Sequence, residues 1–516
     1  MLRNVTLFLH NGATRYYATA ALPLKADKII RSPLITCKNA GLNLFPDQLA
    51  SPEKKLGEIP LASKGWKHRK SKGDFFYIHP TVKDEVEYHS LKSTETLTEC
   101  QIDPIFIKNL KEHLEIDGLT SIQRNAIPLV INMNHVLIAA ETGCGKTLAY
   151  LLPIVQQILQ KKQSSDNRKM NTPLAIIITP GRELASQIGG VAEKLCRETG
   201  INVKTILGGN TKQIMMNPEF DDMDILVASM GAVSKLVTTG IYRMNKVRHV
   251  VLDEADTLLD DSFSNKLCHF LKRFPFYKNH LEDLSDKIVG TQLILASATM
   301  PTNITEILKE IIDTETIREV VSPNLHRLMP NIKHKFLKMN KSDRPGHLLT
   351  TVKAELRKNH PIIVFGNKSV TSDYVSIFLN DSGVNCVNLN GDMLMKIRIG
   401  RFEKFQNGEV DVLSTTDVGS RGLDTTRARH VINFDFPLHV ADYIHRTGRI
   451  GRVGSLHNCT VTNFVSSLRE IEIVQQIEHA ARTGSILPNV NANITNLIFK
   501  RIANDIKREE RKTIFQ

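Results

Sequence analysis

The chain has 516 residues, of which 41% are hydrophobic and 23% charged, a balance that excludes a wholly disordered protein and leaves room for two or three domains. Its 67 lysines and arginines exceed its 54 acidic residues, and the net charge of +13 is compatible with a polyanionic partner or with simple surface solubility. The seven cysteines form no CxxC pair, so neither a zinc cluster nor a disulfide framework is predicted. The sequence has no run of about 18 consecutive apolar residues, which predicts that the chain does not insert into a membrane.

Residues 1–46 have the composition of an organellar presequence. They hold one acidic residue, Asp27, and the basic residues Arg3, Arg15, Lys25, Lys28, Arg31 and Lys38. An import potential that is negative inside draws such arginine-rich, acid-poor, amphipathic segments. We therefore predict a mitochondrial transit peptide over residues 1–46 and a location in the mitochondrial matrix. An ordinary basic tail is the alternative reading, with the nucleus or cytoplasm as the alternative location.

Residues 47–96 form a basic extension. Between residues 60 and 95, lysines and arginines interleave with four aromatic residues, Trp66, Phe75, Phe76 and Tyr77. Two interpretations are open: the segment grips single-stranded nucleic acid by charge and stacking, or it packs as a connector, which is the commoner outcome.

From about Leu97, short apolar runs alternate with amphipathic stretches, which predicts buried parallel strands separated by helices. The runs of the first half are 135–140, 174–179, 225–228, 249–252 and 292–297. After a proline-containing stretch at 323–330, the runs of the second half are 361–365, 384–389, 410–414, 430–434 and 458–464. We predict two α/β domains with parallel sheets in tandem, at 97–322 and 333–495, and a basic, helical tail at 496–516. Ligands of such sheets bind at the carboxyl ends of the strands.

A phosphate-binding loop follows the first of these strands. The run 135–140 leads into Glu141, Thr142, Gly143, Cys144, Gly145, Lys146 and Thr147, and a helix-like stretch comes next. Gly143 and Gly145 let the backbone N–H groups point at phosphate oxygens, and the helix N-terminus adds positive charge. Lys146 is expected to neutralise the β- and γ-phosphates of ATP, and the Thr147 hydroxyl to coordinate Mg²⁺. Ala140 stands at the first glycine of the general pattern, so this is a variant loop.

Two carboxylates follow a strand about a hundred residues later. The apolar run 249–252 ends in Asp253 and Glu254. At the carboxyl end of a strand, Asp253 can hold Mg²⁺ through water and Glu254 can act as the general base on the attacking water. In isolation such acids would be read as a helix N-cap, but beside a phosphate loop they indicate ATP hydrolysis.

Together with the loop, the residues Asp-Glu-Ala-Asp at 253–256 resemble the signature of the DEAD-box RNA helicases. The resemblance implies two RecA-like domains, with ATP and Mg²⁺ as cofactors. Upstream, Thr120-Ser-Ile-Gln123 resembles the adenine-reading motif, and Gln123 suits adenine because an amide can donate and accept together. The resemblance assigns base stacking to an aromatic residue, Phe106.

Further motifs of the first domain resemble those that touch RNA. They lie at 180–185, where the sequence reads Pro-Gly-Arg-Glu-Leu-Ala, and at Gly208-Gly209. The resemblance implies RNA-backbone contacts by Arg182, Gly208, Gly209 and Gly231. It also implies that Ser297 and Thr299 couple hydrolysis to strand separation.

The second domain continues the family order with motifs at 364–368, Arg398, 414–424 and 445–452. The resemblance implies RNA contacts by Gly366, Arg398 and Thr416, and a contact between Asp424 and the nucleotide ribose. It further implies that Arg449 and Arg452 reach the γ-phosphate as arginine fingers. A guanidinium suits this role because it stays charged and presents a fork of donors to the phosphoryl oxygens.

Three positions depart from the family pattern. Gly181 replaces a threonine, Ser229-Met-Gly-Ala232 replaces Thr-Pro-Gly-Arg, and Met395 stands where a glutamine is usual. All three belong to RNA motifs, so we expect an intact ATPase with a retuned grip on RNA.

The stretch 253–263, Arg398 and Gly419 look most like the mitochondrial members of the family that are associated with assembly of the large mitoribosomal subunit. This resemblance implies ribosomal RNA as substrate and large-subunit assembly proteins as partners. We expect a monomer.

We predict an RNA-dependent ATPase, converting ATP and water to ADP and phosphate, whose two domains close around ATP and RNA and open RNA duplexes locally or remodel ribonucleoproteins. An RNA-binding scaffold that uses ATP only as a clamp is one alternative. A DNA translocase is a second, which Gln123 and the DEAD tetrad disfavour.

Overall fold

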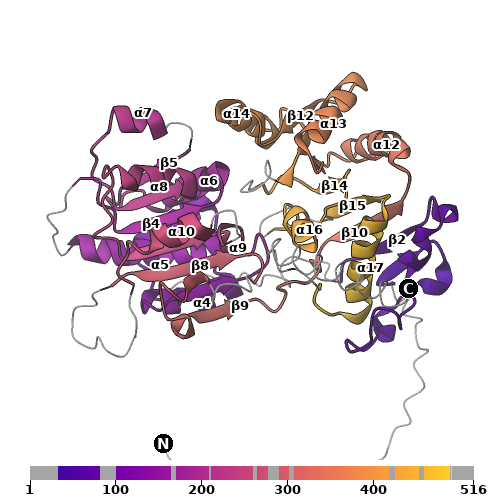
Figure 1. Cartoon of the computed structure of the whole chain (residues 1–516), viewed down its shortest axis with the longest axis horizontal. Helices are drawn as coiled ribbons and strands as arrows, with labels where there is room; N and C mark the ends of the chain where they lie inside the picture. The colour runs from indigo at the N-terminus through magenta and orange to yellow at the C-terminus, as the bar shows by residue number, and fades with distance from the viewer. Residues whose placement is uncertain are drawn as a thin grey trace, which may run out of the picture.

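The computed structural model describes residues 33–81, 100–163, 170–208, 211–259, 264–276, 290–300, 307–417, 425–452, 458–488 and 490. Two sheets, one parallel and one parallel except for its first two strands, lie beside one another, each flanked by helices (Figure 1). This is the predicted tandem of RecA-like domains.

The first domain is built on a seven-stranded sheet with the order β5-β6-β4-β7-β8-β3-β9, all of whose pairings are parallel. Its strands are β3 (Val136–Ala139), β4 (Ala175–Thr179), β5 (Val203–Ile206), β6 (Ile225–Ser229), β7 (His249–Asp253), β8 (Gln292–Ser297) and β9 (Arg318–Val321). Its helices are α3 (Pro104–Leu114), α4 (Ser121–Ile131), α5 (Lys146–Gln163), α6 (Arg182–Leu195), α7 (Thr211–Met216), α8 (Met230–Thr238), α9 (Ala255–Leu258) and α10 (Ser264–Leu271).

Alternate residues of each central strand point to opposite faces of this sheet. In β3, Val136 and Ile138 join one buried apolar cluster, whereas Leu137 and Ala139 join the other. A strand covered on both faces must be apolar throughout, which is why these strands read as continuous hydrophobic runs.

The second domain has an eight-stranded sheet with the order β1-β2-β10-β15-β14-β11-β13-β12. Its strands are β1 (Ile35–Cys37), β2 (Phe75–Ile78), β10 (Lys333–Lys338), β11 (Ile362–Phe365), β12 (Cys386–Leu389), β13 (Val412–Thr415), β14 (His430–Asn433) and β15 (Thr460–Val465). Its helices are α12 (Arg344–Leu356), α13 (Ser369–Asp381), α14 (Met395–Gln406), α16 (Val440–Thr447) and α17 (Leu468–Thr483). The six strands from β10 onward pair in parallel.

Residues 33–81 belong to the second sheet, although they precede the first domain in the chain. β2 pairs antiparallel with β10, and β1 pairs antiparallel with β2. Figure 1 shows this indigo segment beside β10 and α17. Trp66 and Phe76 are almost fully buried, with ring centroids 5.6 Å apart, so the aromatic residues at these two positions pack and do not stack on nucleic acid. Of the two interpretations of this stretch, packing holds for these rings.

A buried carboxylate anchors the segment to α17. Glu478 accepts hydrogen bonds from the backbone N–H groups of Ala62 (2.8 Å) and Ser63 (3.0 Å) and from the Ser63 hydroxyl (2.6 Å). Arg482 donates to Glu478 (2.8 Å) and to the carbonyl of Leu42 (2.9 Å). The second domain is therefore discontinuous in sequence, which a linear reading into 47–96 and 333–495 did not anticipate.

All ten strands predicted from apolar runs are present within a few residues of their expected positions. The strands without such a run were missed: β1, β2, β5, β9 and β10. The expected helix at 496–516 lies outside the described residues. Within the described part of the chain, no helix has the length and apolarity needed to cross a bilayer.

Candidate active site between the two domains

The phosphate-binding loop lies between β3 and α5, as predicted. Gly143 and Gly145 adopt φ values of +81° and +91°, which side-chain-bearing residues rarely reach. Lys146 is the first residue of α5, and its ammonium donates to the carbonyls of Ala140 (2.7 Å) and Glu141 (2.8 Å). The lysine thus lies folded along its own loop, within reach of an anion held there. Burial raises the pKa of the Cys144 thiol to about 11, so this cysteine stays neutral.

Gln123 binds the backbone of this loop. Its amide N–H donates to the carbonyl of Gly145 (3.0 Å), and its amide oxygen accepts from the backbone N–H of Thr120 (2.8 Å) in a capping box at the start of α4. Thr120 in turn donates to the carbonyl of Cys144 (3.0 Å). The predicted adenine reader is therefore connected to the phosphate loop by hydrogen bonds.

The structure does not support the stacking role of Phe106. Its side chain has no exposed surface and lies in the core cluster that also contains Ile102 and Leu110. Phe106 and Leu110 are four residues apart in α3, so they lie on the same buried face of that helix. A ring enclosed in this way offers no face to a base, and sequence reasoning mistook a core residue for a ligand contact.

Asp253 and Glu254 close β7 at the carboxyl edge of the first sheet. Asp253 accepts hydrogen bonds from the Tyr150 hydroxyl (2.8 Å) and from the backbone N–H of Glu254 (2.8 Å). Burial raises the pKa of Asp253 to about 6, and the adjacent Glu254 charge adds to the rise. A buried acid held by two donors is well placed to hold a cation.

Glu254 has a strained backbone and an unsatisfied side chain. Its φ and ψ are 51° and 51°, a left-handed conformation that costs on the order of 1–3 kcal/mol for a residue other than glycine. Its Oε2 atom is buried and accepts no hydrogen bond from any described residue. A carboxylate oxygen that accepts no hydrogen bond from the protein can accept one from the attacking water, as a general base must.

Asp256 connects the acidic tetrad to Ser297 and Thr299. Its carboxylate accepts from the Thr299 hydroxyl (2.7 Å) and backbone N–H (3.1 Å), and the Ser297 hydroxyl donates to the Thr299 carbonyl (2.5 Å). His445 of the second domain lies 3.7 Å from the same carboxylate. Although burial acts to raise the pKa of Asp256, His445 and the Thr299 hydroxyl hold it below its usual value. The predicted coupling residues therefore lie where the two domains meet.

The second domain reaches the phosphate loop through the segment that begins with α16. The Thr142 hydroxyl donates to the carbonyl of Gly448 across the domain boundary (3.1 Å). A Cβ atom placed on Gly143 would lie 2.4 Å from Cγ of Arg452, so the arginine stem packs directly on the glycine. Both close approaches depend on glycine.

Both predicted arginine fingers emerge from this segment. Arg449 Nε donates to the carbonyl of His445 (3.1 Å), and Arg452 Nε donates to that of Gly448 (2.9 Å). These bonds hold the Nε atom of each guanidinium against the backbone of its own segment.

A pocket lies between the domains. It is lined by Thr142, Gly143, Lys146, Leu184, Gln187, Asp253, Glu254, Ser297, Ala298, His445, Arg449 and Arg452. The residues that sequence reasoning assigned to catalysis thus line one pocket, which contains two arginines, two carboxylates and a lysine. Asp424 lies outside the described residues.

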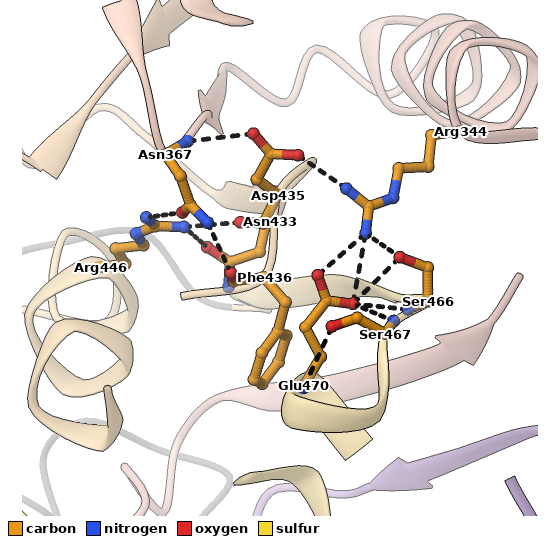
Figure 2. A network of polar contacts seen from close by, with 9 residues as sticks. All are labelled: Arg344, Asn367, Asn433, Asp435, Phe436, Arg446, Ser466, Ser467 and Glu470. Atoms are coloured by element: carbon orange, nitrogen blue, oxygen red, sulfur yellow. Dashed lines mark hydrogen bonds and ion pairs between the residues drawn. The ribbon is translucent and has the colours of Figure 1, made fainter. Parts of the chain in front are cut away.

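A buried polar network fixes α16, the helix that precedes Arg449 and Arg452. Arg446 makes two hydrogen bonds to Asp417 (2.6 and 2.7 Å) and others to Asn367 (2.7 Å), Asn433 (3.2 Å) and the carbonyl of Asp435 (2.7 Å). Figure 2 shows its guanidinium facing Asn367 and Asn433. The loops that follow β11, β13 and β14 are therefore tied to α16.

A second arginine extends this network to α17. Arg344 donates to Asp435 (2.7 Å), to the Ser466 hydroxyl (2.6 Å) and to both oxygens of Glu470 (3.2 and 3.3 Å). The Asp435 carboxylate also accepts from the backbone N–H of Asn367 (3.1 Å). Arg344 binds the Asp435 carboxylate and Arg446 binds the Asp435 carbonyl, so this one residue connects the two arginines (Figure 2). Charge-assisted bonds of this kind hold loops rigidly in a low-dielectric interior.

The predicted RNA residues lie at the carboxyl edges of the two sheets. Arg182 packs on Gly208, since a Cβ there would lie 2.9 Å from its Nε, and Gly366 packs against Thr371. Gly231 lies in α8, Thr416 is buried just after β13, and Gly209 lies outside the described residues.

Arg398, which the resemblance assigns to RNA, lies beside the first domain in this structure. Its Nη2 atom lies 2.9 Å from Oε1 of Glu183 in the first domain, and both side chains are about one-tenth exposed. The pair is close in distance but lacks hydrogen-bond geometry. In this arrangement Arg398 links the two domains.

Sequence reasoning missed Gln187, which lines the pocket, and Tyr150 and Gly448, which bind the lining residues Asp253 and Thr142. Tyr150 and Gln187 carry no motif signal, and Gly448 was quoted within a motif without a role. Asp256 was part of the quoted tetrad, but nothing in the sequence showed that it would bind Thr299.

Many known proteins are similar to this chain in sequence. A family model described as DEAD/DEAH box helicase matches residues 120–307, and one described as helicase conserved C-terminal domain matches residues 344–454. The chain is similar to the probable ATP-dependent RNA helicase DDX28 of Mus musculus (34% identity over 446 residues) and of Homo sapiens (35% over 451 residues), in each case over 84% of this chain and 82% of the relative.

Two solved structures share the fold. S. cerevisiae Dbp5 bound to RNA and ADP BeF3 aligns with a TM-score of 0.62 at 23% identity, covering 76% of this chain and 94% of the other. The DEAD-box helicase Mss116 bound to ssRNA and UDP-BeF aligns with a TM-score of 0.62 at 22% identity, covering 76% and 79%.

Proposed function

Because this chain belongs to the DEAD-box family of ATP-dependent RNA helicases, we propose that it hydrolyses ATP in the pocket between its two domains and uses closure of that pocket to open or remodel RNA locally. The observation that carries the proposal is the split pocket, with Lys146, Asp253 and Glu254 from one domain and Arg449 and Arg452 from the other. Neither half is complete alone, so hydrolysis depends on closure.

Each residue has a role that follows from its chemistry. Lys146 neutralises phosphate oxygens, and Thr147 and Asp253 hold Mg²⁺, which supplies charge stabilisation at the phosphoryl group. Glu254 takes the proton of the attacking water. Arg449 and Arg452 stabilise the charge that develops on the γ-phosphoryl oxygens.

RNA is the partner, and we propose that it crosses the carboxyl edges of both sheets. Arg182, Gly208 and Gly231 contribute from the first domain, and Gly366 and Thr416 from the second. Contacts with backbone phosphates give strong salt dependence and little sequence preference. We assign Gly209 to the same surface and Asp424 to the ribose of the nucleotide.

The presequence-like composition supports import into mitochondria. We propose that the substrate is mitochondrial ribosomal RNA, that the protein acts in assembly of the large ribosomal subunit, and that it is a monomer. We place the end of the leader before Leu34 and not at residue 46. The backbone N–H of Leu34 donates to Leu44 (2.8 Å) and Ile35 is fully buried, so a cut at 46 would remove β1 from its sheet.

Steady-state ATPase assays with RNA and with DNA of the same sequence test the proposal. We expect multiple turnovers stimulated by RNA only. One ATP held without turnover would support the clamp alternative, and equal stimulation by DNA would support a translocase. Glu254→Gln is expected to bind ATP normally and lose turnover, whereas the matched control Glu193→Gln, on the exposed face of α6, is expected to keep it.

A further inference from the structure

Four exposed basic residues protrude from the segment that packs on α17. We define the basic knuckle as Lys64, Lys67, Arg69 and Lys70. All four side chains are exposed, and none forms an ion pair with any residue in the described ranges. Residues 62–73 contain no acidic residue, so no carboxylate within this stretch offsets the four positive charges.

The knuckle is held rigidly. Two 3₁₀ helices, Ala62–Lys67 and Arg69–Ser71, present the four side chains. The Ser71 hydroxyl donates to the carbonyls of Trp66 (3.1 Å) and His68 (2.7 Å), and Gln475 of α17 donates to the Ser63 carbonyl (3.2 Å). Since Trp66 is buried and Glu478 holds Ser63, little conformational freedom remains to be lost when an anion binds.

Its position relates it to the proposed path of RNA. β2 is antiparallel to β10, with Phe75 opposite Leu337, and the backbone N–H of Gly73 donates to the carbonyl of Lys338 (2.9 Å). The residues immediately before β2 therefore lie at the carboxyl edge of the second sheet, and Arg69 and Lys70 of the knuckle come just before them in the chain. Lys72 forms an ion pair with Asp343 (3.1 Å), and Asp343 lies in the segment that follows β10. This ion pair holds the residues before β2 at the carboxyl edge. Gly366 follows β11 at the same edge. β11 lies four strand spacings from β2, which corresponds to about 19 Å across the sheet.

We infer that the basic knuckle is a second RNA-binding surface, which holds the phosphate backbone of RNA that flanks the segment gripped between the two domains. The inference rests on the proposed function, since it requires RNA at the domain interface. RNA fits better than an acidic protein because a strand leaving the carboxyl edge continues past the same edge, carrying a charge on every nucleotide. The one aromatic residue within the knuckle, Trp66, is buried, so recognition by the knuckle is by charge and has no base preference.

Salt titrations of RNA binding test the inference. Two fluorescent oligouridylates are needed, one that just fills the site between the domains and one extended at either end. The test variant is K64Q/K67Q/R69Q/K70Q. The matched control, K111Q/K194Q/K246Q/K309Q, removes four charges from exposed lysines of the first domain.

For the long RNA, the slope of log K against log salt is expected to fall by about 3 in the knuckle variant, from about 0.7 for each lost single-strand phosphate contact. Binding of the short RNA and the ATPase that it stimulates should not change. An unchanged slope for the long RNA would overturn the inference, as would an equal decrease in the control. If RNA failed to stimulate the wild-type ATPase, the proposed function itself would fail, which is a separate result.

Discussion

Gly448 is the point where a single methyl group should prevent closure. A Cβ at this position would lie 1.5 Å from Oγ1 and 2.8 Å from Cβ of Thr142 in the opposite domain. The backbone of Gly448 has φ −71° and ψ 7°, which alanine adopts without strain, so the second domain itself should fold normally. Overpacking destabilises a packed interface by about 1–3 kcal/mol. Because the added Cβ would lie so close to Oγ1 of Thr142, we expect the closed state to be destabilised by the upper end of this range. A loss of about 3 kcal/mol reduces the closed population roughly a hundredfold.

The assay is RNA-stimulated ATP turnover at saturating ATP and RNA. Gly448→Ala should lose most of this turnover while binding a fluorescent ATP analogue as wild type does, because the first domain is unchanged. Gly346→Ala, at an exposed glycine of α12 where an added Cβ meets nothing, is the control. Adding Thr142→Gly to Gly448→Ala removes both clashing atoms and should restore part of the turnover. Wild-type turnover by Gly448→Ala would refute the reasoning.

Three other substitutions test the site and the fold. Tyr150→Phe removes the hydroxyl donor to Asp253, a charge-assisted bond worth about 1.5–3 kcal/mol, and should raise the Mg²⁺ concentration for half-maximal ATPase at least tenfold; an unchanged Mg²⁺ dependence would show that Tyr150 does not orient Asp253. Glu478→Gln leaves Arg482 without its buried partner, a loss of about 3–5 kcal/mol, and should expose residues 33–81 to limited proteolysis, unlike exposed Glu472→Gln. Burial lowers the pKa of His249 from 6.5 to about 4, so the unfolded chain binds the extra proton and stability is lost as the pH falls below 6.5. By pH 5 this loss is about 2 kcal/mol, and His249→Gln should unfold with a correspondingly smaller difference between pH 7 and pH 5; an identical difference would contradict the assignment.

The sequence predicted the parts of the site that are local in the chain. The phosphate loop and the Asp253-Glu254 pair each follow one apolar strand, so their chemistry and their place at the sheet edge could be read together. The strands buried on both faces could be located for the same reason.

The remaining features depend on contacts between distant segments. The strand Phe75–Ile78 lies in a basic stretch with only alternate residues buried, and its partner β10 comes more than 250 residues later. Nothing near Gly448 indicates that Thr142 will touch it. Phe106 shows the converse error, since an aromatic at a suitable spacing from Gln123 is a core residue once α3 is packed.

The central claim is that ATP and RNA together stabilise the arrangement in which the two half-sites meet. Fluorescence energy transfer between labels at Lys235 in α8 and Glu403 in α14, both exposed, measures that approach directly. In the Glu254→Gln variant, which retains ATP, we predict a high-transfer state only when ATP and RNA are both present. A high-transfer state with ATP alone, or no change when both are added, would contradict the account.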